Sequence, residues 1–308
     1  MNRSVPVLIT WDVDPILWVP LERRKWALNT AADLCYHHGI SATFFFTAQP
    51  ADVYPDDFEK MRAQGHEIGC HGLTHGIEEN YDRMSEPMQR DYIAQATEKL
   101  QTLVGEPIRT FRSPRVKTSA TTLRLLAGNG YLTDSSVCSQ RLDLLSSNLI
   151  NTGWIFSPRR PYRPHRDNAF KSGDLAIWEI PVSAAAVPFI SSTLRVLGLP
   201  AMKMLFKLLY AESRHTHKPI VYLAHPTEFL ERKVKGKKGL WKLYTKREYF
   251  TPSFIQAHGL RPRSLLYRMD GEALCKNTQE LLAYIASFPD IRFMTVSEYA
   301  ICHLGEVS

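Results

Sequence analysis

The sequence EIGCHGLTH at residues 67–75 places two histidines four residues apart, directly after a short apolar run that predicts a β-strand. A neutral imidazole is the commonest protein ligand for a first-row divalent metal ion. If the backbone turns helically after His71, residues i and i+4 share one face, and the rings of His71 and His75 can reach one ion. Such a pair is weak evidence on its own, so its meaning depends on the other motifs in the chain.

A second candidate lies near the N-terminus, in the sequence LITWDVD at residues 8–14. Residues 7–11 are apolar and β-prone, which predicts a buried strand, and Asp12 and Asp14 follow at its end. Because side chains alternate along a strand, both carboxylates point to the same side if the strand geometry continues. Ligands of α/β folds gather beyond the carboxyl ends of parallel strands. Taken alone, the pattern is better explained by a strand that reaches solvent or by an Asp that caps a turn.

Two further motifs follow, FRSPR at residues 111–115 and VYLAHP at residues 221–226. Together and in this order, the four motifs resemble those of the polysaccharide deacetylase family, the carbohydrate deacetylases that share the NodB homology domain. In that family, a Thr-Phe-Asp-Asp motif supplies a catalytic base and a metal ligand, and a His-x-x-x-His motif supplies two more ligands. An Arg-x-Pro-aromatic motif orients the catalytic carboxylate, and a Leu-x-His motif carries the general acid.

The resemblance implies one divalent metal ion bound by Asp14, His71 and His75. Zinc is the first choice because two imidazoles and one carboxylate suit it, and cobalt, nickel, manganese and iron remain alternatives. The chain departs from the family pattern at Val13, which separates the two carboxylates. Variants with Asp-x-Asp are similar to the branch that acts on nucleotide- or lipid-linked sugars and on small amides. The insertion leaves open which of the two carboxylates is the base and which is the ligand.

The resemblance also implies catalytic roles. Asp12 would be the base, Arg112 would hold Asp12 as a carboxylate, and His225 would protonate the departing nitrogen. Arg115 replaces the aromatic residue of the family motif, so the contact of an aromatic ring is absent. The backbone N–H of Arg115 can still help to hold an oxyanion, and we expect Arg115 to bind substrate in this way.

The function implied by the resemblance is metal-dependent removal of an acetyl or formyl group from an amino sugar. An alternative is the opening of a small cyclic amide or ureide by the same metal site. A third hypothesis is a non-catalytic binder that kept the fold, and the presence of every residue needed for the chemistry argues against it.

The order of elements predicts the fold class. Apolar runs that alternate with amphipathic segments predict parallel βα units. The expected strands cover residues 7–11, 41–48, 67–70, 109–112 and 131–137, and the expected helices cover residues 22–38, 55–64, 87–104 and 119–127. The resemblance implies an irregular (β/α) barrel with the site at its C-terminal rim. We expect one catalytic domain over residues 1–308, with residues 184–270 as an apolar and basic insertion.

The second half of the chain has a less regular pattern. It predicts a long loop at 151–173, a strand at 175–182, an apolar block at 184–211, a helix at 278–287 and a strand at 291–296 that closes the barrel. His165 is either an extra ligand or, more commonly, a solvated residue of a basic loop. Asp134 and Glu179 suit either a site or a structural ion pair, and the sequence singles out none of the three.

Composition suggests where the protein works. The chain of 308 residues has five cysteines without C-x-x-C spacing, which suits a reducing compartment. The sequence has no apolar run of about 18 residues and no apolar segment before the first strand. We therefore expect a cytoplasmic protein without a secretory signal.

Residues 232–268 contain eleven Lys or Arg residues against Glu248 alone, interleaved with Trp and Tyr, in a chain whose net charge is only +7. Such a surface prefers an anionic partner. Nucleic acid is disfavoured because no recognised binding motif accompanies the charge. We expect a polyprenyl-phosphate-linked or nucleotide-linked sugar as substrate, and peripheral attachment to the anionic inner face of the cytoplasmic membrane, where the 184–211 block would dip into the interface. The alternative is that this block is core and the charge serves a soluble phosphate-bearing substrate.

Overall fold

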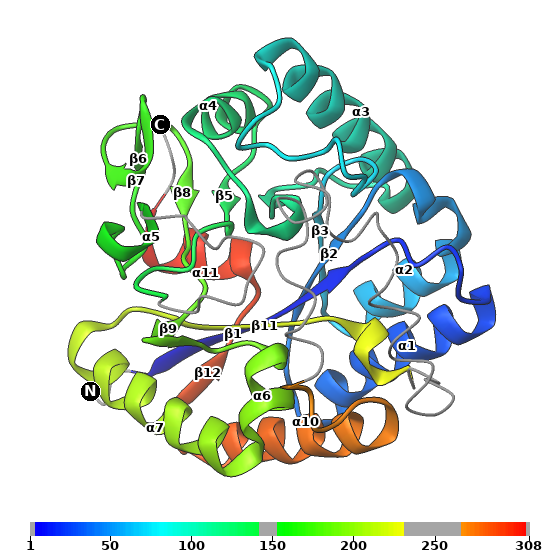
Figure 1. Cartoon of the computed structure of the whole chain (residues 1–308), viewed down its shortest axis with the longest axis vertical. Helices are drawn as coiled ribbons and strands as arrows, with labels where there is room; N and C mark the ends of the chain where they lie inside the picture. The colour runs from blue at the N-terminus through cyan, green and yellow to red at the C-terminus, as the bar shows by residue number, and fades with distance from the viewer. Residues whose placement is uncertain (1–3, 142–152, 231–265, 306–308) are drawn as a thin grey trace.

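Nine consecutive buried residues form β1 (Val5–Val13), the strand around which the sheet is built (Figure 1). The computed structural model describes residues 4–141, 153–230 and 266–305. β1 pairs in parallel with β2 (Thr43–Phe46), β11 (Ile220–Ala224) and β12 (Ile291–Phe293). A strand that is covered on both faces is mostly apolar, which is why residues 5–9 show no polar alternation. The polar exceptions in β1 are Thr10 and Asp12, and both accept hydrogen bonds from Arg112.

The main sheet has the order β11-β1-β2-β3-β4-β5-β8, and β12 pairs with β1. Its remaining members are β3 (Glu67–Cys70), β4 (Thr110–Phe111), β5 (Thr133–Asp134) and β8 (Trp178–Glu179), all paired in parallel. The gap between β8 and β11 is bridged irregularly, since the N–H of Ser183 donates to the carbonyl of Val221 at 3.1 Å. This curled parallel sheet confirms the predicted (β/α) barrel.

Helices surround the sheet in Figure 1. The four predicted helices of the first half are confirmed as α1 (Leu21–His37), α2 (Pro55–Ala63), α3 (Glu86–Val104) and α4 (Ala120–Gly128). In the second half, α7 (Leu199–Thr216) lies beside β1 and β11, and α10 (Gly271–Ala286) packs on α7. The chain also contains the short 3₁₀ segments η1 (Gln49–Val53), η2 (Pro114–Val116) and η3 (Pro226–Phe229).

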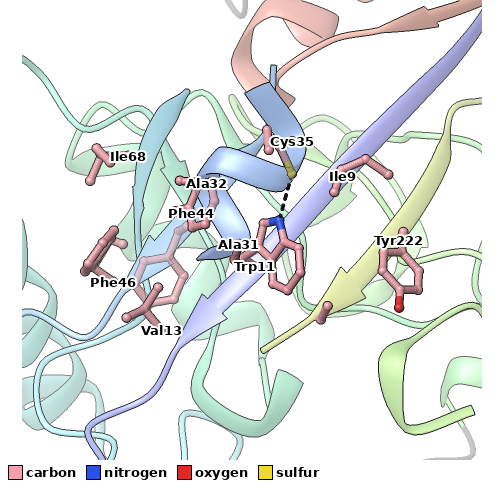
Figure 2. Close-up of a cluster of buried hydrophobic side chains, with 14 of the residues drawn as sticks. Ile9, Trp11, Val13, Ala31, Ala32, Cys35, Phe44, Phe46, Ile68 and Tyr222 are labelled. Atoms are coloured by element: carbon pink, nitrogen blue, oxygen red, sulfur yellow. Dashed lines mark hydrogen bonds between the residues drawn. The ribbon is translucent and has the colours of Figure 1, made fainter. Parts of the chain in front are cut away.

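Figure 2 draws part of the largest buried cluster, with side chains from β1, α1 and the neighbouring strands. The indole of Trp11 stacks on the ring of Phe44 at a centroid distance of 6.0 Å, and its Nε1 donates to Sγ of Cys35 at 3.4 Å. Burial raises the pKa of the Cys35 thiol to about 12, so this cysteine is an inert core residue. Asp12 and Asp14, which follow Trp11 in the sequence, line the pocket of the candidate site.

The second half departs from the sequence predictions in two places, the loop at 151–173 and the end of the last strand. The loop expected at 151–173 contains α5 (Gly153–Phe156) and a hairpin of β6 (Pro164–His165) and β7 (Asn168–Ser172), which its weak hydrophobic pattern did not indicate. The 184–211 block is divided into a hairpin, α6 (Ser191–Leu197) and α7, because Gly198 (φ 82°) separates the two helices. The last strand ends at Phe293, and α11 (Val296–His303) follows it.

α7 packs one face on the core through Met202, Leu205, Phe206 and Leu209, which favours the core explanation for that face of the 184–211 block. No helix of the described ranges is long and apolar enough to cross a membrane. Most of the basic region predicted to face an anionic partner, at residues 231–265, lies outside the described residues. The division into one domain with an insertion at 184–270 stays a prediction.

Candidate active site

The carboxyl ends of β1, β3 and β11 meet at one rim of the sheet, and each is followed by a predicted site residue. Asp12 is the penultimate residue of β1, His71 follows β3, and His225 follows β11. With Asp14 and His75, these side chains line a single pocket. The four motifs are far apart in sequence, so only the parallel sheet brings them together.

Asp14, His71 and His75 form a compact cluster whose three ligating atoms lie within 4.8 Å of one another. Oδ1 of Asp14 is 3.5 Å from Nε2 of His71 and 3.4 Å from Nε2 of His75. This oxygen is buried and has no hydrogen-bond partner among the described residues. Nδ1 of His71 donates to the carbonyl of Arg112 at 2.8 Å, so the lone pair of Nε2 is directed into the cluster. These donors fit one divalent metal ion.

Electrostatics support the same assignment. Burial alone would raise the pKa of Asp14, but the adjacent His75, His71 and His225 hold that pKa well below its usual value. Burial lowers the pKa of His75 to about 4, against the opposing effect of Asp14. The cluster therefore has an ionised carboxylate and a neutral His75 at neutral pH, the states in which both side chains bind metals.

The backbone between the two histidines is not helical, which corrects the prediction of a helical turn after His71. Gly72 (φ 76°) and His75 (φ 56°) both have left-handed backbones, and a Cβ at Gly72 would clash with Oε1 of Glu79. The two imidazoles still lie close, with centroids 5.2 Å apart. A loop, and not a helix face, brings the two rings together.

Glu79 holds this loop in place and was not identified from the sequence. Its fully buried carboxylate accepts from the N–H groups of Leu73 (2.7 Å), Thr74 (2.7 Å) and His75 (2.6 Å), and from the hydroxyl of Tyr81 at 3.0 Å. Successive N–H groups that point at one carboxylate form an anion-binding nest. The only signal in the sequence is an acidic residue shortly after the histidine pair, and such residues are common.

Glu79→Gln should loosen the histidine loop. The amide N–H groups of the new glutamine would face backbone N–H groups of the loop, so buried donors would lose their acceptor. This should lower the free energy of unfolding by about 2–3 kcal/mol. Metal affinity should fall roughly 10- to 100-fold, as for other supports of metal ligands. Urea unfolding and zinc titration measure both effects, and Glu78→Gln is the control because Glu78 is exposed. Equal behaviour of the two variants would remove this role from Glu79.

Arg112 is fully buried behind the pocket. Its Nη1 donates to Oδ1 of Asp12 and to Oγ1 of Thr10, both at 2.8 Å. Its Nε and Nη2 donate to the carbonyl and the hydroxyl of Ser135, also at 2.8 Å. A guanidinium held at this many points cannot rotate, and it fixes the orientation of the Asp12 carboxylate beside the cluster.

Asp134 and Glu179 face each other across β5 and β8 and are both fully buried. Oδ1 of Asp134 accepts a hydrogen bond from the hydroxyl of Ser136 at 2.6 Å, and Oε1 of Glu179 accepts one from the N–H of Val137 at 3.0 Å. The other two oxygens have no donor in the described part of the chain. Burial raises the pKa of Asp134 to about 6 and raises that of Glu179 well above its usual value. The pair therefore shares a proton at neutral pH, behind the Ser135 peptide that holds Arg112.

This pair predicts a pH dependence of stability. Both pKa values are raised in the folded state, so the pair stabilises the fold fully below the ordinary carboxyl pKa, and that stability is lost as pH rises through the folded values. Glu179→Gln keeps the contact with Val137 and removes one titrating group. Its free energy of unfolding should decline less steeply above pH 4.5, by up to about 1.4 kcal/mol per pH unit. Urea unfolding at several pH values tests this, with the exposed Glu280→Gln as control; parallel slopes would contradict it.

His225 and Arg115 complete the pocket lining. Nε2 of His225 is 3.9 Å from Oδ2 of Asp14, on the open side of the cluster. The guanidinium of Arg115 donates to the carbonyls of Gly76 and His75, so its side chain supports the histidine loop. Arg115 (φ 58°) and Val116 (φ 52°) both have left-handed backbones, which are costly for residues with side chains and cluster at functional sites. His165, the other histidine considered in the sequence analysis, is exposed and does not line this pocket.

Comparison with known proteins shows which family the first part of the chain is similar to. Residues 3–133 match the family model described as polysaccharide deacetylase, and this segment contains three of the four motifs. The family resemblance is therefore confirmed over this part of the chain. No curated protein matches the sequence significantly.

Solved structures extend the likeness in fold to almost the whole chain. "Crystal structure of putative polysaccharide deacetylase from Mycobacterium smegmatis" has a TM-score of 0.62 at 17% identity and covers 97% of this chain and 90% of its own. A structure titled as a probable polysaccharide deacetylase from Pseudomonas aeruginosa PAO1 has a TM-score of 0.57 at 14% identity, with 98% and 93% covered. The allantoinase Puue has a TM-score of 0.58 at 17% identity, with 98% and 92% covered. These likenesses confirm the predicted barrel.

Proposed function

We propose that the protein is a metal-dependent hydrolase that removes an acetyl or formyl group from the nitrogen of an amino sugar. The observation that carries the proposal is the cluster of Asp14, His71 and His75, whose ligating atoms converge in a pocket that also contains Asp12 and His225. Amide hydrolysis by a metal site requires metal ligands and groups that transfer protons. The pocket contains both. Their presence argues against a protein that only binds sugars.

Asp14, His71 and His75 would hold the metal, with zinc as the first choice. A bound divalent ion would activate water and polarise the amide carbonyl. The chain supplies the proton transfers. Asp12, oriented by Arg112, would take a proton from the attacking water, and His225 would give a proton to the departing nitrogen. The backbone N–H of Arg115 would help to hold the oxyanion.

The rest of the pocket supports an amphipathic substrate. Beyond the polar cluster it is lined by apolar side chains, among them Val182, Val187, Ile190, Val196, Leu197 and Leu223. Arg115 and Arg141 line the same pocket. An apolar wall with the guanidinium of Arg141 beside it suits a sugar that carries a phosphate and a hydrocarbon chain. We therefore place a polyprenyl-phosphate-linked precursor of glycan assembly ahead of a nucleotide-linked sugar.

The decisive experiment is a turnover screen of the metal-loaded protein. N-acetyl and N-formyl amino sugars would be offered free, as polymers, on a nucleotide diphosphate and on a polyprenyl phosphate, with acetate and formate release measured. We expect release from the polyprenyl-phosphate-linked sugar at rates well above the others. Absence of release from every N-acyl sugar would reject the proposal.

One observation favours a second candidate, hydrolysis of a small cyclic amide or ureide. The allantoinase with a similar fold aligns over almost the whole chain, although at 17% identity it shows only the fold. The same screen should therefore include allantoin, with the ring-opened product measured. Ring opening without acyl release would establish this alternative.

We also propose attachment to the inner face of the cytoplasmic membrane, with an anionic lipid surface as partner. On α7, Met204 and Leu208 are 66% and 59% exposed, next to Lys203 and Lys207. Basic residues near an anionic leaflet contribute about 1 kcal/mol each. Flotation with anionic vesicles should show binding that weakens with salt and with the double variant Met204→Ser/Leu208→Ser. Equal binding to neutral vesicles, or none to either, would contradict the attachment.

A further inference from the structure

His225 is followed directly by the 3₁₀ segment η3, in which the N–H of Glu228 donates to the carbonyl of His225 at 3.1 Å. Side chains three residues apart eclipse in such a turn, so the carboxylate of Glu228 lies over the imidazole of His225. Nδ1 of His225 is 4.0 Å from Oε2 of Glu228. Both atoms are buried, and neither has a hydrogen-bond partner within residues 4–141, 153–230 and 266–305. Two complementary polar atoms without partners thus face each other beside the pocket.

The other oxygen of Glu228 is already held. Nη1 of Arg195, on α6, donates to Oε1 of Glu228 at 3.0 Å, and the Arg195 side chain is only 1% exposed. Arg195 is fixed in turn by the carbonyl of Met269, which accepts from its Nε at 3.2 Å, and by the ring of Tyr267 at 3.7 Å from its guanidinium carbon. The buried Arg195 therefore orients the carboxylate of Glu228 and leaves its Oε2 directed at His225.

We propose that Glu228 is a positioning residue for His225. Its Oε2 accepts the hydrogen of Nδ1, which turns Nε2 of the imidazole toward the pocket, where that atom lies 3.9 Å from Oδ2 of Asp14. We expect this 4.0 Å separation to shorten to hydrogen-bond length when substrate binds, because catalytic hydrogen bonds tighten in the substrate complex. The inference rests on the proposed role of His225 as general acid.

The proton balance of that role explains why a carboxylate is useful at this position. The protonated imidazole carries hydrogens on both nitrogens, and the Nε2 hydrogen passes to the departing nitrogen of the amide as the C–N bond breaks. The Nδ1 hydrogen remains, so the product is the neutral tautomer that Glu228 binds. Without an acceptor at Nδ1, the ring can rotate or adopt the other neutral tautomer, in which Nε2 carries the hydrogen and Nδ1 has the lone pair.

Glu228→Gln makes the proposal measurable because glutamine has one oxygen and one amide nitrogen. Arg195 has only donors, so it takes the oxygen and leaves the amide hydrogens facing Nδ1. Nδ1 of His225 must then accept, and the neutral ring changes to the Nε2–H tautomer. In protein labelled with ¹⁵N-histidine, long-range ¹H–¹⁵N spectra at alkaline pH report the tautomer, and His225→Gln assigns the signal. Zinc addition separates this signal from those of His71 and His75.

We expect the Nδ1–H tautomer in the native protein and in the control Glu280→Gln, and the Nε2–H tautomer in Glu228→Gln. Turnover of an N-acetyl amino sugar should fall roughly 10²-fold in kcat with little change in KM, while 4-nitrophenyl acetate, whose leaving group needs no proton, should be affected much less. Glu228→Asp should recover part of the loss. The same tautomer in native protein and Glu228→Gln would overturn the proposal, as would equal losses with both substrates. If the tautomers behave as expected and no amide is turned over, the contact stands and the proposed function fails.

Discussion

His71→Ala and His75→Ala should each lose bound metal together with turnover. Each variant removes one imidazole from a cluster in which both Nε2 atoms lie within 3.5 Å of Oδ1 of Asp14, and two remaining ligands do not hold a divalent ion firmly. A catalytic metal contributes several kcal/mol to transition-state stabilisation, which corresponds to a loss of about 10³-fold or more in kcat. Elemental analysis after dialysis and acyl-release assays on the same samples measure both effects.

The control for this experiment is His165→Ala. His165 was the other histidine that the sequence offered as a ligand, and it is exposed on the β6–β7 hairpin, so its removal should leave metal content unchanged. Thermal unfolding would show whether His71→Ala, which also removes the hydrogen bond to the carbonyl of Arg112, remains folded. Full metal occupancy in either His71→Ala or His75→Ala would exclude this cluster as the metal site.

The elements of the first half were predictable because each rests on a local pattern. The apolar run before Asp12 and the Gly that ends α3 can be recognised in single segments of sequence. The candidate metal ligands and the pairing of Arg112 with Asp12 came from motifs that resemble a family, and the geometry brings them together. The β6–β7 hairpin was missed because its strands are short and poorly alternating.

The residues that support the site could not be predicted, for a different physical reason. Glu79 is recognisable only once three backbone N–H groups turn toward it, which depends on the left-handed conformations of Gly72 and His75. The pairing of Arg195 with Glu228 joins segments 33 residues apart in sequence, and nothing local marks either partner. Such contacts depend on the assembled barrel, so the sequence indicates the reacting groups more readily than the groups that orient them.

Asp12→Asn should retain metal and lose kcat by roughly 10²- to 10⁴-fold, the usual range for one acid–base residue. Asparagine has nearly the same shape, and its oxygen can still accept from Nη1 of Arg112, which lies 2.8 Å from Oδ1 in the native site. The amide cannot take a proton from water at neutral pH, so the base function is removed. Metal content, kcat and the free energy of unfolding should be measured together, because Arg112 is left buried without its counter-charge and breaking such a pair costs about 3–5 kcal/mol.

Asp14→Asn is the matched variant that resolves the ambiguity created by Val13. Oδ1 of Asp14 contacts Nε2 of both cluster histidines, whereas the nearest oxygen of Asp12 is 4.0 Å from Nε2 of His71 and its other oxygen is engaged by Arg112. The distances therefore favour Asp14 as ligand and Asp12 as base, and Asp14→Asn should lose metal. If Asp12→Asn empties the site while Asp14→Asn stays loaded, the two carboxylates have exchanged roles, and Arg112 then orients a metal ligand instead of a base.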